Sequence, residues 1–272
     1  MDAMQITQHN NIVELGAGTG KFTRDLVAAV PGVQIVAVEP TQMGERIGEL
    51  PVVQVLSESA QSMPSVPSGG ADAVFAAQSF HWFATPESLR EIHRVLTPGG
   101  RLGLVWNTTQ AVEEFVAPYY DDSVPRQQSG QWRRAFDAVP GLFAAKASHK
   151  HSWVHLVNAE SFVNRAMSIS VLAAQDASTK RGVHQSLEQH LQKHLHWILE
   201  AANGGARGGD LSHDEDRGHT SMKGCLAVLC DEGSDTANHV GGLQSVKTQD
   251  GRTFKVVYSV PYVTDAFVFE KS

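Results

Sequence analysis

The sequence predicts an α/β protein with a doubly wound, Rossmann-like and mostly parallel sheet. Two observations support this prediction. Short apolar runs alternate with stretches whose apolar residues recur at helical spacing, and a glycine-rich turn joins the first apolar run to the first helical stretch. Strands that are buried on both faces give uninterrupted apolar runs, and a helix between two strands lets them run parallel.

The predicted strands are five short apolar runs: Ile12–Leu15, Gln34–Val38, Val52–Leu56, Ala73–Ala76 and Leu102–Trp106. One predicted helix begins near Lys21 and ends at Pro31-Gly32, because proline and glycine disfavour helix interiors. Another begins at Thr85-Pro86, a pair that favours helix starts. In such a sheet a ligand binds beyond the carboxyl ends of the strands, so the candidate site consists of residues that follow the runs.

A glycine-rich loop with the sequence Gly16-Ala17-Gly18-Thr19-Gly20 follows the first predicted strand, and Glu14 lies two positions before its first glycine. Glycines leave room for a ligand, and the helix that opens near Lys21 offers unpaired backbone N–H groups. Glu39 ends the second strand, where a carboxylate can accept hydrogen bonds from both hydroxyls of a ribose. This order of strand, loop, helix, strand and acid predicts a site for a nucleotide-type cofactor.

The spacing of the loop glycines bears on which cofactor binds. The pattern here is G-x-G-x-G, whereas the dinucleotide fingerprint is G-x-G-x-x-G. S-adenosylmethionine (SAM) has no phosphate, and Glu14 is a suitable electrostatic partner for its cationic end. An NAD(P)-dependent oxidoreductase and a purely structural turn remain as alternatives.

The chain resembles the class I SAM-dependent methyltransferases, and within them the type 11 group with a Phe-His-Trp-Phe signature. The segments that carry the resemblance occur in the family's order: 13–23, 36–40, 59–64, 72–83 and 91–102. The resemblance implies an in-line transfer of the methyl group from SAM, and the chain's acidic charge balance makes a small-molecule acceptor the simpler expectation. It also implies an antiparallel terminal strand and a helical elaboration on the substrate side. The cofactor contacts that the glycine loop and the resemblance predict are Glu14, Gly16, Ala17, Gly18, Thr19, Gly20, Glu39, Ser59, Ala60, Gln61 and Gln78.

His81 is the candidate catalytic residue. It follows the fourth predicted strand and would lie near the methyl donor, where it could position an acceptor or take a proton. Trp82 could form a wall of the same cavity. The alternative is that both side chains only stabilise the turn between strand and helix. A general base is needed only when the acceptor must lose a proton, and a carboxylate acceptor would not.

Four segments describe the expected domain organisation: a SAM-binding core at 1–107, a helical substrate-side region at 108–200 with a core strand near 150–156, a flexible insertion at 201–252, and C-terminal strands at 253–272 that complete the sheet. In the helical region Tyr119, Tyr120, Trp132 and Arg133 are candidates for shaping an acceptor pocket, although aromatic residues at such spacing are more often core.

Histidines at helical spacing, His190 and His194 among them, suggest a metal site, but a solvated face of an amphipathic helix explains them better, and we expect no metal. Only Met1 to Asn10 precede Asn11, so the helix that closes over the cofactor in relatives is expected to be missing or truncated. Position 59 holds serine where the family often has aspartate. A degenerate, non-catalytic relative is therefore a further alternative.

Composition limits the class of partner. A formal net charge of −7 and a pI near 6.0 argue against a broad nucleic-acid surface, because phosphate binding needs concentrated Lys and Arg. No stretch reads as a membrane segment. The two cysteines lie in the predicted insertion and no secretory leader is evident, so a reducing, cytoplasmic location is expected. The sequence leaves the oligomeric state and the acceptor's identity open.

Overall fold

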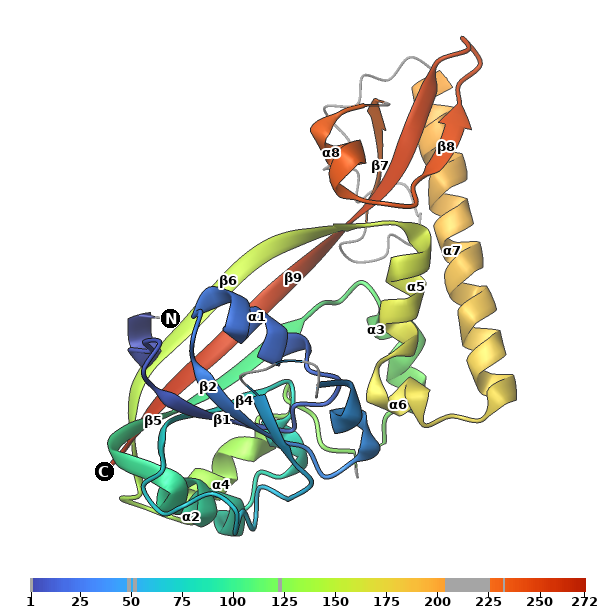
Figure 1. Ribbon diagram of the computed structural model, residues 1–272. Helices are drawn as coiled ribbons and strands as arrows, with labels where there is room; N and C mark the ends of the chain where they lie inside the picture. The colour runs from blue at the N-terminus through green and yellow to red at the C-terminus, as the bar shows by residue number, and fades with distance from the viewer. Residues whose placement is uncertain (1, 48–49, 51–52, 122–123, 204–225, 232) are drawn as a thin grey trace. The chain divides into compact units, whose positions relative to one another are not determined.

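The computed structural model describes residues 2–47, 50, 53–121, 124–203, 226–231 and 233–272. The chain divides into two compact units (Figure 1). The first unit consists of residues 1–107, 123–151 and 264–272, and the second consists of residues 108–122 and 152–263. Across the described residues, no helix is both long enough and apolar enough to cross a membrane.

The first unit is built on a parallel sheet whose strands are β1 (Asn11–Leu15), β2 (Gln34–Val38), β3 (Val53–Leu56), β4 (Ala71–Ala77) and β5 (Leu96–Thr108). Strand β1 pairs in parallel with both β2 and β4, β2 pairs with β3, and β4 pairs with β5, which gives the order β3-β2-β1-β4-β5. The order changes direction between β1 and β4, the position where open α/β sheets bind ligands. The predicted fold class is confirmed.

The strands of the first unit are connected by helices and short 3₁₀ turns: η1 (Asp2–Met4), α1 (Lys21–Ala29), η2 (Gln42–Ile47), η3 (Phe80–Trp82), α2 (Pro86–Val95), η5 (Gln131–Arg133) and α4 (Arg134–Asp137). The start of α2 lies where the sequence predicts it. The Thr85 side chain accepts a hydrogen bond from Ser88 N at 3.2 Å, and Pro86 occupies the first turn. The buried face of this helix contains Leu89, Ile92 and Val95, which recur at the spacing of an amphipathic helix.

Two long strands continue the sheet beyond β5, in the order β5-β9-β6. Strand β6 (Phe143–Val157) is longer than the strand expected near 150–156, and β9 (Thr253–Lys271) is one strand where several were expected from residue 253. The chain stays extended through Pro261, so this proline does not end the strand. Residues 143–151 and 264–271 of these strands belong to the first unit.

The second unit combines helices with a small antiparallel sheet. Its elements are α3 (Glu113–Val116), η4 (Ala117–Tyr119), α5 (Ala159–Met167), α6 (Ser170–Ala173), α7 (Ala177–Asn203), β7 (Leu226–Asp231), α8 (Asp235–His239) and β8 (Gln244–Lys247). Strands β7 and β8 both pair antiparallel with the beginning of β9. Helix α7 buries Leu187, Leu191 and Leu195 in a core that also contains Phe162 and Tyr258.

The flexible insertion expected at 201–252 contains regular secondary structure in the part of it that the structure describes. Residues 204–225 and 232 lie outside the described residues, but β7, α8 and β8 occupy most of the remainder. Each of these elements has only four to six residues. Such short elements show no sustained hydrophobic period, and their pairing with β9 cannot be read from the local sequence.

Candidate active site

The glycine-rich loop leaves the carboxyl end of β1 and enters α1. Gly16, Gly18 and Gly20 have φ values of +66°, +57° and +77°, in the left-handed region that glycine adopts without strain. The Gly16 N–H donates to the Val38 carbonyl at 2.8 Å, which connects the loop to the end of β2. Glycine is therefore required here for the shape of the backbone as well as for open space.

The loop is tightly packed at its two ends and open in its middle. A Cβ atom at Gly16 would lie 2.7 Å from the Cβ of Ser79, and one at Gly20 would lie 2.8 Å from Cγ1 of Ile47. A Cβ at Gly18 would meet no atom of the described chain within 4 Å. A ligand can thus approach the backbone most closely around Gly18.

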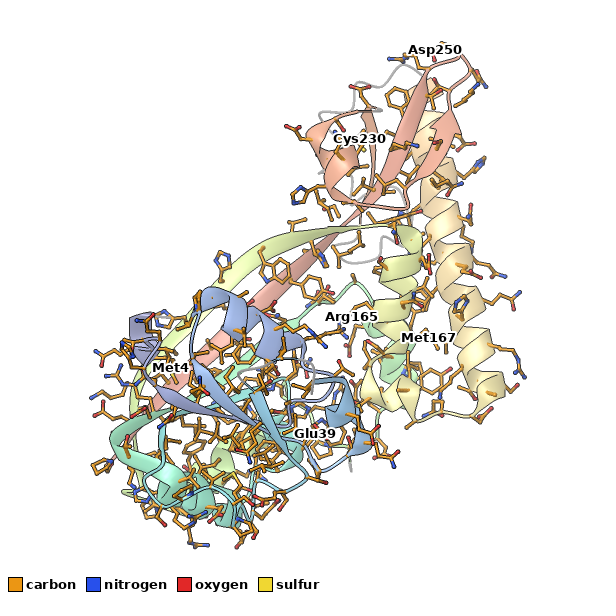
Figure 2. The ribbon with its side chains drawn as sticks, in the orientation of Figure 1. Met4, Glu39, Arg165, Met167, Cys230 and Asp250 are labelled. Atoms are coloured by element: carbon orange, nitrogen blue, oxygen red, sulfur yellow. The ribbon has the colours of Figure 1, made fainter. Side chains whose placement is uncertain are left out.

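Glu39 follows β2 and lies against the middle of the loop; Figure 2 labels its side chain. Its Oε2 accepts a hydrogen bond from Gly18 N at 2.8 Å. Its Oε1 accepts hydrogen bonds from Thr41 N at 3.0 Å and from Thr41 Oγ1 at 2.6 Å. A carboxylate oxygen has two lone-pair positions, so Oε2 can accept a further hydrogen bond from a ribose hydroxyl and keep Gly18 in place.

Glu14 lies in β1 directly before the loop and is almost completely buried. Its Oε2 accepts a hydrogen bond from the Thr23 hydroxyl at 2.6 Å. Burial raises the pKa of Glu14 to about 7; the Thr23 hydrogen bond opposes this rise, and the negative charge of Glu39 adds to it. A cation bound beside the loop would favour the ionised form of Glu14.

The turn after β3 contains Ser59, Ala60 and Gln61, the residues predicted to contact the adenine. Ser62 N donates to the Ser59 carbonyl at 3.0 Å, which closes the turn. Ala60 is buried, Ser59 is half-buried and Gln61 is exposed. Because β1, β2 and β3 are parallel, this turn leaves the same edge of the sheet as the glycine loop and Glu39.

The end of β4 supplies Gln78 and Ser79 to the same edge. Gln78 has a φ of +59°, which is strained for a residue with a side chain. Its N–H donates to the Val105 carbonyl at 2.8 Å, and its Nε2 donates to the Asn107 carbonyl at 2.6 Å. Ser79 Oγ donates to the Leu15 carbonyl at 2.7 Å, so the ends of β4 and β1 are joined at the start of the loop.

His81 lies in η3, directly after this turn. The Trp106 Nε1–H donates to His81 Nδ1 at 3.1 Å, and burial lowers the pKa of His81 to about 4. An indole N–H can only donate, so Nδ1 holds the lone pair and the proton of the neutral ring is on Nε2. In this arrangement His81 can donate one hydrogen bond to a ligand, and it is not a base near neutral pH. The adjacent Trp82 side chain is largely exposed.

The four residues proposed for an acceptor pocket belong to different units of the chain. Tyr119 and Tyr120 pack against the core of the second unit, whereas Trp132 and Arg133 belong to the first. Trp132 is buried in the first unit's core, and the Arg133 guanidinium carbon lies 4.2 Å from the centroid of the Trp132 ring.

The histidines of α7 differ in their surroundings. His184 and His196 are exposed and form ion pairs with Glu188 at 3.4 Å and Glu200 at 3.2 Å. The Nε2 atoms of His190 and His194 lie 3.1 Å apart. These two side chains are half-buried, and burial lowers the pKa of each, so a fully solvated face is wrong for them. In the part of the chain that the structure describes, no three His, Cys, Asp or Glu side chains are grouped so as to hold a metal ion.

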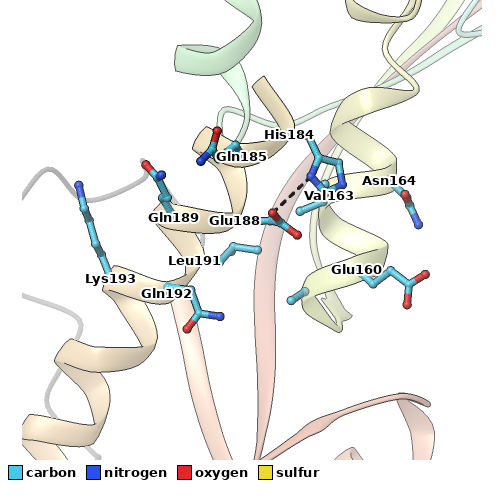
Figure 3. Close-up of a pocket in the computed structure, with 11 residues that line it drawn as sticks. Glu160, Val163, Asn164, His184, Gln185, Glu188, Gln189, Leu191, Gln192 and Lys193 are labelled. Atoms are coloured by element: carbon cyan, nitrogen blue, oxygen red, sulfur yellow. Dashed lines mark ion pairs between the residues drawn. The ribbon is translucent and has the colours of Figure 1, made fainter. Parts of the chain in front are cut away.

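A groove of about 860 Å³ lies between α5 and α7 in the second unit. Figure 3 shows the His184–Glu188 ion pair on one wall and the Glu160 side chain, from α5, on the other. Glu160, Glu188 and Lys193 give the groove mixed charge. Its lining contains none of the residues that the sequence predicted for cofactor or acceptor.

Three hydroxyl residues, Thr23, Thr41 and Ser79, are essential to the site's geometry and were missed by sequence reasoning. Thr41 has a local signal, because threonine side chains commonly form hydrogen bonds with groups a few residues away in the chain. Thr23 lies in the first turn of α1 and could have been predicted to face Glu14 beneath the loop. Ser79 has no such signal, because its partner Leu15 is far away in the sequence.

Comparison with known proteins identifies a methyltransferase domain over residues 13–104. An uncharacterized methyltransferase-like protein of Schizosaccharomyces pombe is 37% identical over 154 residues, which are 56% of this chain and 53% of that protein. An uncharacterized methyltransferase of Mycobacterium tuberculosis is 30% identical over 185 residues, which are 67% of this chain and 74% of that protein. The chain thus spans about half the length of the first of these relatives.

Solved structures agree on the fold. A candidate methyltransferase of Bacillus halodurans superposes with a TM-score of 0.50 at 15% identity, over 100% of this chain and 96% of that one. A candidate type II methyltransferase of Anaeromyxobacter dehalogenans gives the same TM-score and identity over 94% and 88% of the two chains. At this level of identity the likeness concerns the fold alone.

Proposed function

The chain belongs to the family of SAM-dependent methyltransferases, and on this premise we propose that it transfers a methyl group from SAM to a small-molecule acceptor. The observation that carries the proposal is the pair of buried carboxylates, Glu14 and Glu39, at one glycine loop. Glu39 suits a ribose, which a dinucleotide also carries, whereas Glu14 suits the cationic end of SAM and would repel the pyrophosphate of a dinucleotide at the loop. This charge pattern argues against an NAD(P)-dependent oxidoreductase.

Each group of site residues has a role in this proposal. When bound, SAM supplies an activated methyl group on its sulfonium. Glu39 accepts a hydrogen bond from a ribose hydroxyl through Oε2, while Gly16, Ala17, Gly18, Thr19 and Gly20 provide the backbone that approaches the ligand. Glu14 stabilises the cationic end from beneath the loop, and Ser59, Ala60, Gln61 and Gln78 border the adenine and methionine portions. Alignment of this kind can supply about 7–11 kcal/mol of a reaction barrier.

His81 is proposed as a residue that positions the acceptor. Its Nδ1 is held by Trp106, so it offers its Nε2–H to an acceptor oxygen or nitrogen. It does not remove a proton from the acceptor, because a histidine with a pKa of about 4 is a weak base. The proposal therefore favours acceptors that are already ionised or that carry a free lone pair at neutral pH.

Methyl-labelled SAM tests the proposal even while the acceptor is unidentified. The protein is incubated with a cell extract that has been separated into small molecules, proteins and nucleic acids, with an excess of S-adenosylhomocysteine (SAH) as the competing control. We expect the label in the small-molecule fraction, and we expect SAH to suppress it. Label in the protein or nucleic-acid fraction would overturn the small-molecule acceptor. Tight SAH binding without transfer to any fraction would favour a non-catalytic binding module.

A cytoplasmic location stays a prediction.

A further inference from the structure

A cluster of aromatic rings lies beside the candidate active site in the first unit. Its members are Phe80, Trp106, Trp132, Phe136 and Phe267. The centroid of the Trp132 ring lies 5.0 Å from that of Trp106 and 5.2 Å from that of Phe267. These rings come from four separate segments of the chain, so the cluster joins the ends of β4 and β5 to η5 and β9.

A guanidinium group covers one side of this cluster. The Arg133 guanidinium carbon lies 4.2 Å from the centroid of Trp132 and 5.1 Å from that of Phe267. Arg133 is nevertheless exposed, and it forms no ion pair with any residue that the structure describes. Two aromatic faces hold the group in a defined place through cation–π contacts, while its N–H donors remain available to a ligand.

The ring beneath the guanidinium carries a second unused donor. Trp132 is 3% exposed, and its Nε1–H has no acceptor among the described residues. A buried donor without a partner destabilises a folded protein, so native structures rarely contain one. By contrast, the neighbouring Trp106 Nε1–H is satisfied by His81. The Trp132 ring thus brings one unsatisfied polar atom into the apolar core beneath Arg133.

This site is continuous with the proposed cofactor loop. Trp106 contacts Trp132 and donates to His81. Phe80, whose ring centroid lies 6.2 Å from that of Trp132, directly follows Ser79, and Ser79 donates to the carbonyl at the start of the glycine loop. Arg133 is therefore connected, through side chains of one compact unit, to the edge where the methyl donor is expected.

We propose that Arg133 and Trp132 form a binding site for the carboxylate of the methyl acceptor, an inference that rests on the proposed function. A guanidinium presents paired N–H donors that match the two oxygens of a carboxylate. Because the aromatic rings already hold the guanidinium in place, binding costs less conformational entropy than it would for a free arginine. Since His81 does not take a proton from the acceptor, the site suits an acceptor whose carboxyl group is already ionised when it binds. A single guanidinium on the cluster matches one negative charge better than the two of a phosphate.

Benzoate is the probe for this site, and benzamide is its neutral counterpart of the same shape. Each is titrated into the 272-residue protein saturated with SAH, and tryptophan fluorescence reports binding because Trp132 lies beneath Arg133. The variants are Arg133→Met, which removes the charge, Arg133→Lys, which keeps the charge without the planar fork, and Arg134→Met, a matched change at the adjacent exposed arginine. Phenyl phosphate distinguishes a carboxylate site from a phosphate site.

Loss of a hydrogen bond to a charged group typically weakens binding by about 10- to 100-fold. We expect Arg133→Met to weaken benzoate binding by about that factor, Arg133→Lys to weaken it less, and Arg134→Met and SAH affinity to be unchanged. The proposal is overturned if benzoate does not bind, if it binds no better than benzamide, if its affinity survives Arg133→Met, or if phenyl phosphate binds more tightly. A failure of SAH to bind in the preceding saturation step would count against the proposed function instead.

Discussion

Because the pKa of Glu14 is raised in the folded protein, this residue makes the free energy of unfolding depend on pH. A single substitution isolates its contribution. Glu14→Gln removes the ionisation but keeps the size of the side chain and an oxygen that can accept the Thr23 hydrogen bond. In the folded protein burial raises the pKa of Glu14 from 4.5 to about 7. The folded state therefore holds this proton more tightly than the unfolded chain does, and ionisation at higher pH opposes folding.

The size and the pH range of this effect follow from the two pKa values. Below pH 4.5 the carboxyl group is protonated in both states, and its contribution to stability is fully present. That contribution is lost as the pH rises through about 7. Because one pKa unit corresponds to about 1.4 kcal/mol, the complete loss is about 3 kcal/mol in the free energy of unfolding.

His81 acts in the opposite direction and would hide this loss in the wild-type protein. Burial lowers the pKa of His81 from 6.5 to about 4, so the unfolded chain binds this proton more tightly. Stability from His81 is present above pH 6.5 and is lost as the pH falls through about 4. The two contributions nearly cancel in the wild type, whereas the difference between wild type and Glu14→Gln contains only the effect of Glu14.

Urea unfolding followed by tryptophan fluorescence measures that difference at about pH 4.5 and at about pH 8. We expect the stability of Glu14→Gln, relative to wild type, to increase by about 3 kcal/mol between the two. A difference that stays constant across this range would refute the reasoning, because it would mean that Glu14 has an ordinary pKa and is not buried beneath the loop as described.

Two further predictions concern the loop and the aromatic cluster. Gly18→Ala and Gly69→Ala introduce a side chain at similar φ values, +57° and +62°, with no atom of the described chain within 4 Å. Both substitutions should lower the free energy of unfolding by about 1 kcal/mol, but only Gly18→Ala should weaken SAH binding measured by calorimetry. Equal SAH affinities of the two variants would contradict the placement of the cofactor. In urea unfolding, Trp106→Phe should lower the free energy of unfolding by about 1–3 kcal/mol more than Trp132→Phe does. The reason is that, of these two indole N–H groups, only that of Trp106 donates a hydrogen bond, to His81. Equal losses of stability in the two variants would argue against that hydrogen bond.

Most of the parallel core could be predicted from the sequence because its signals are local. The glycines at 16, 18 and 20 need positive φ, and the sequence placed them between a strand and a helix. Thr85-Pro86 begins α2, and Glu39 ends β2 beside the loop. In each case, residues within a few positions of one another determine the local conformation, so a pattern in the sequence is sufficient.

What the sequence did not predict depends on contacts between distant segments. Ser79 joins β4 to the Leu15 carbonyl, and Trp106 fixes the tautomer of His81 across 25 positions. Arg133 lies on Phe267, which is more distant still in the sequence. The strained φ of Gln78 is also set by tertiary structure, since a glutamine has no intrinsic preference for that region. Such features become visible only when the sheet has been assembled.

Binding of the cofactor product to Glu39 tests the central claim most directly. SAH is titrated calorimetrically into wild-type protein, into Glu39→Ala and into Glu45→Ala, a control at an exposed acid of the nearby η2 turn. We expect wild type and Glu45→Ala to bind SAH with affinities of about 1 μM to 1 mM, as is usual for enzyme ligands, and Glu39→Ala to lose binding while remaining folded. Failure of the folded wild-type protein to bind SAH, or equal binding by Glu39→Ala, would contradict the account.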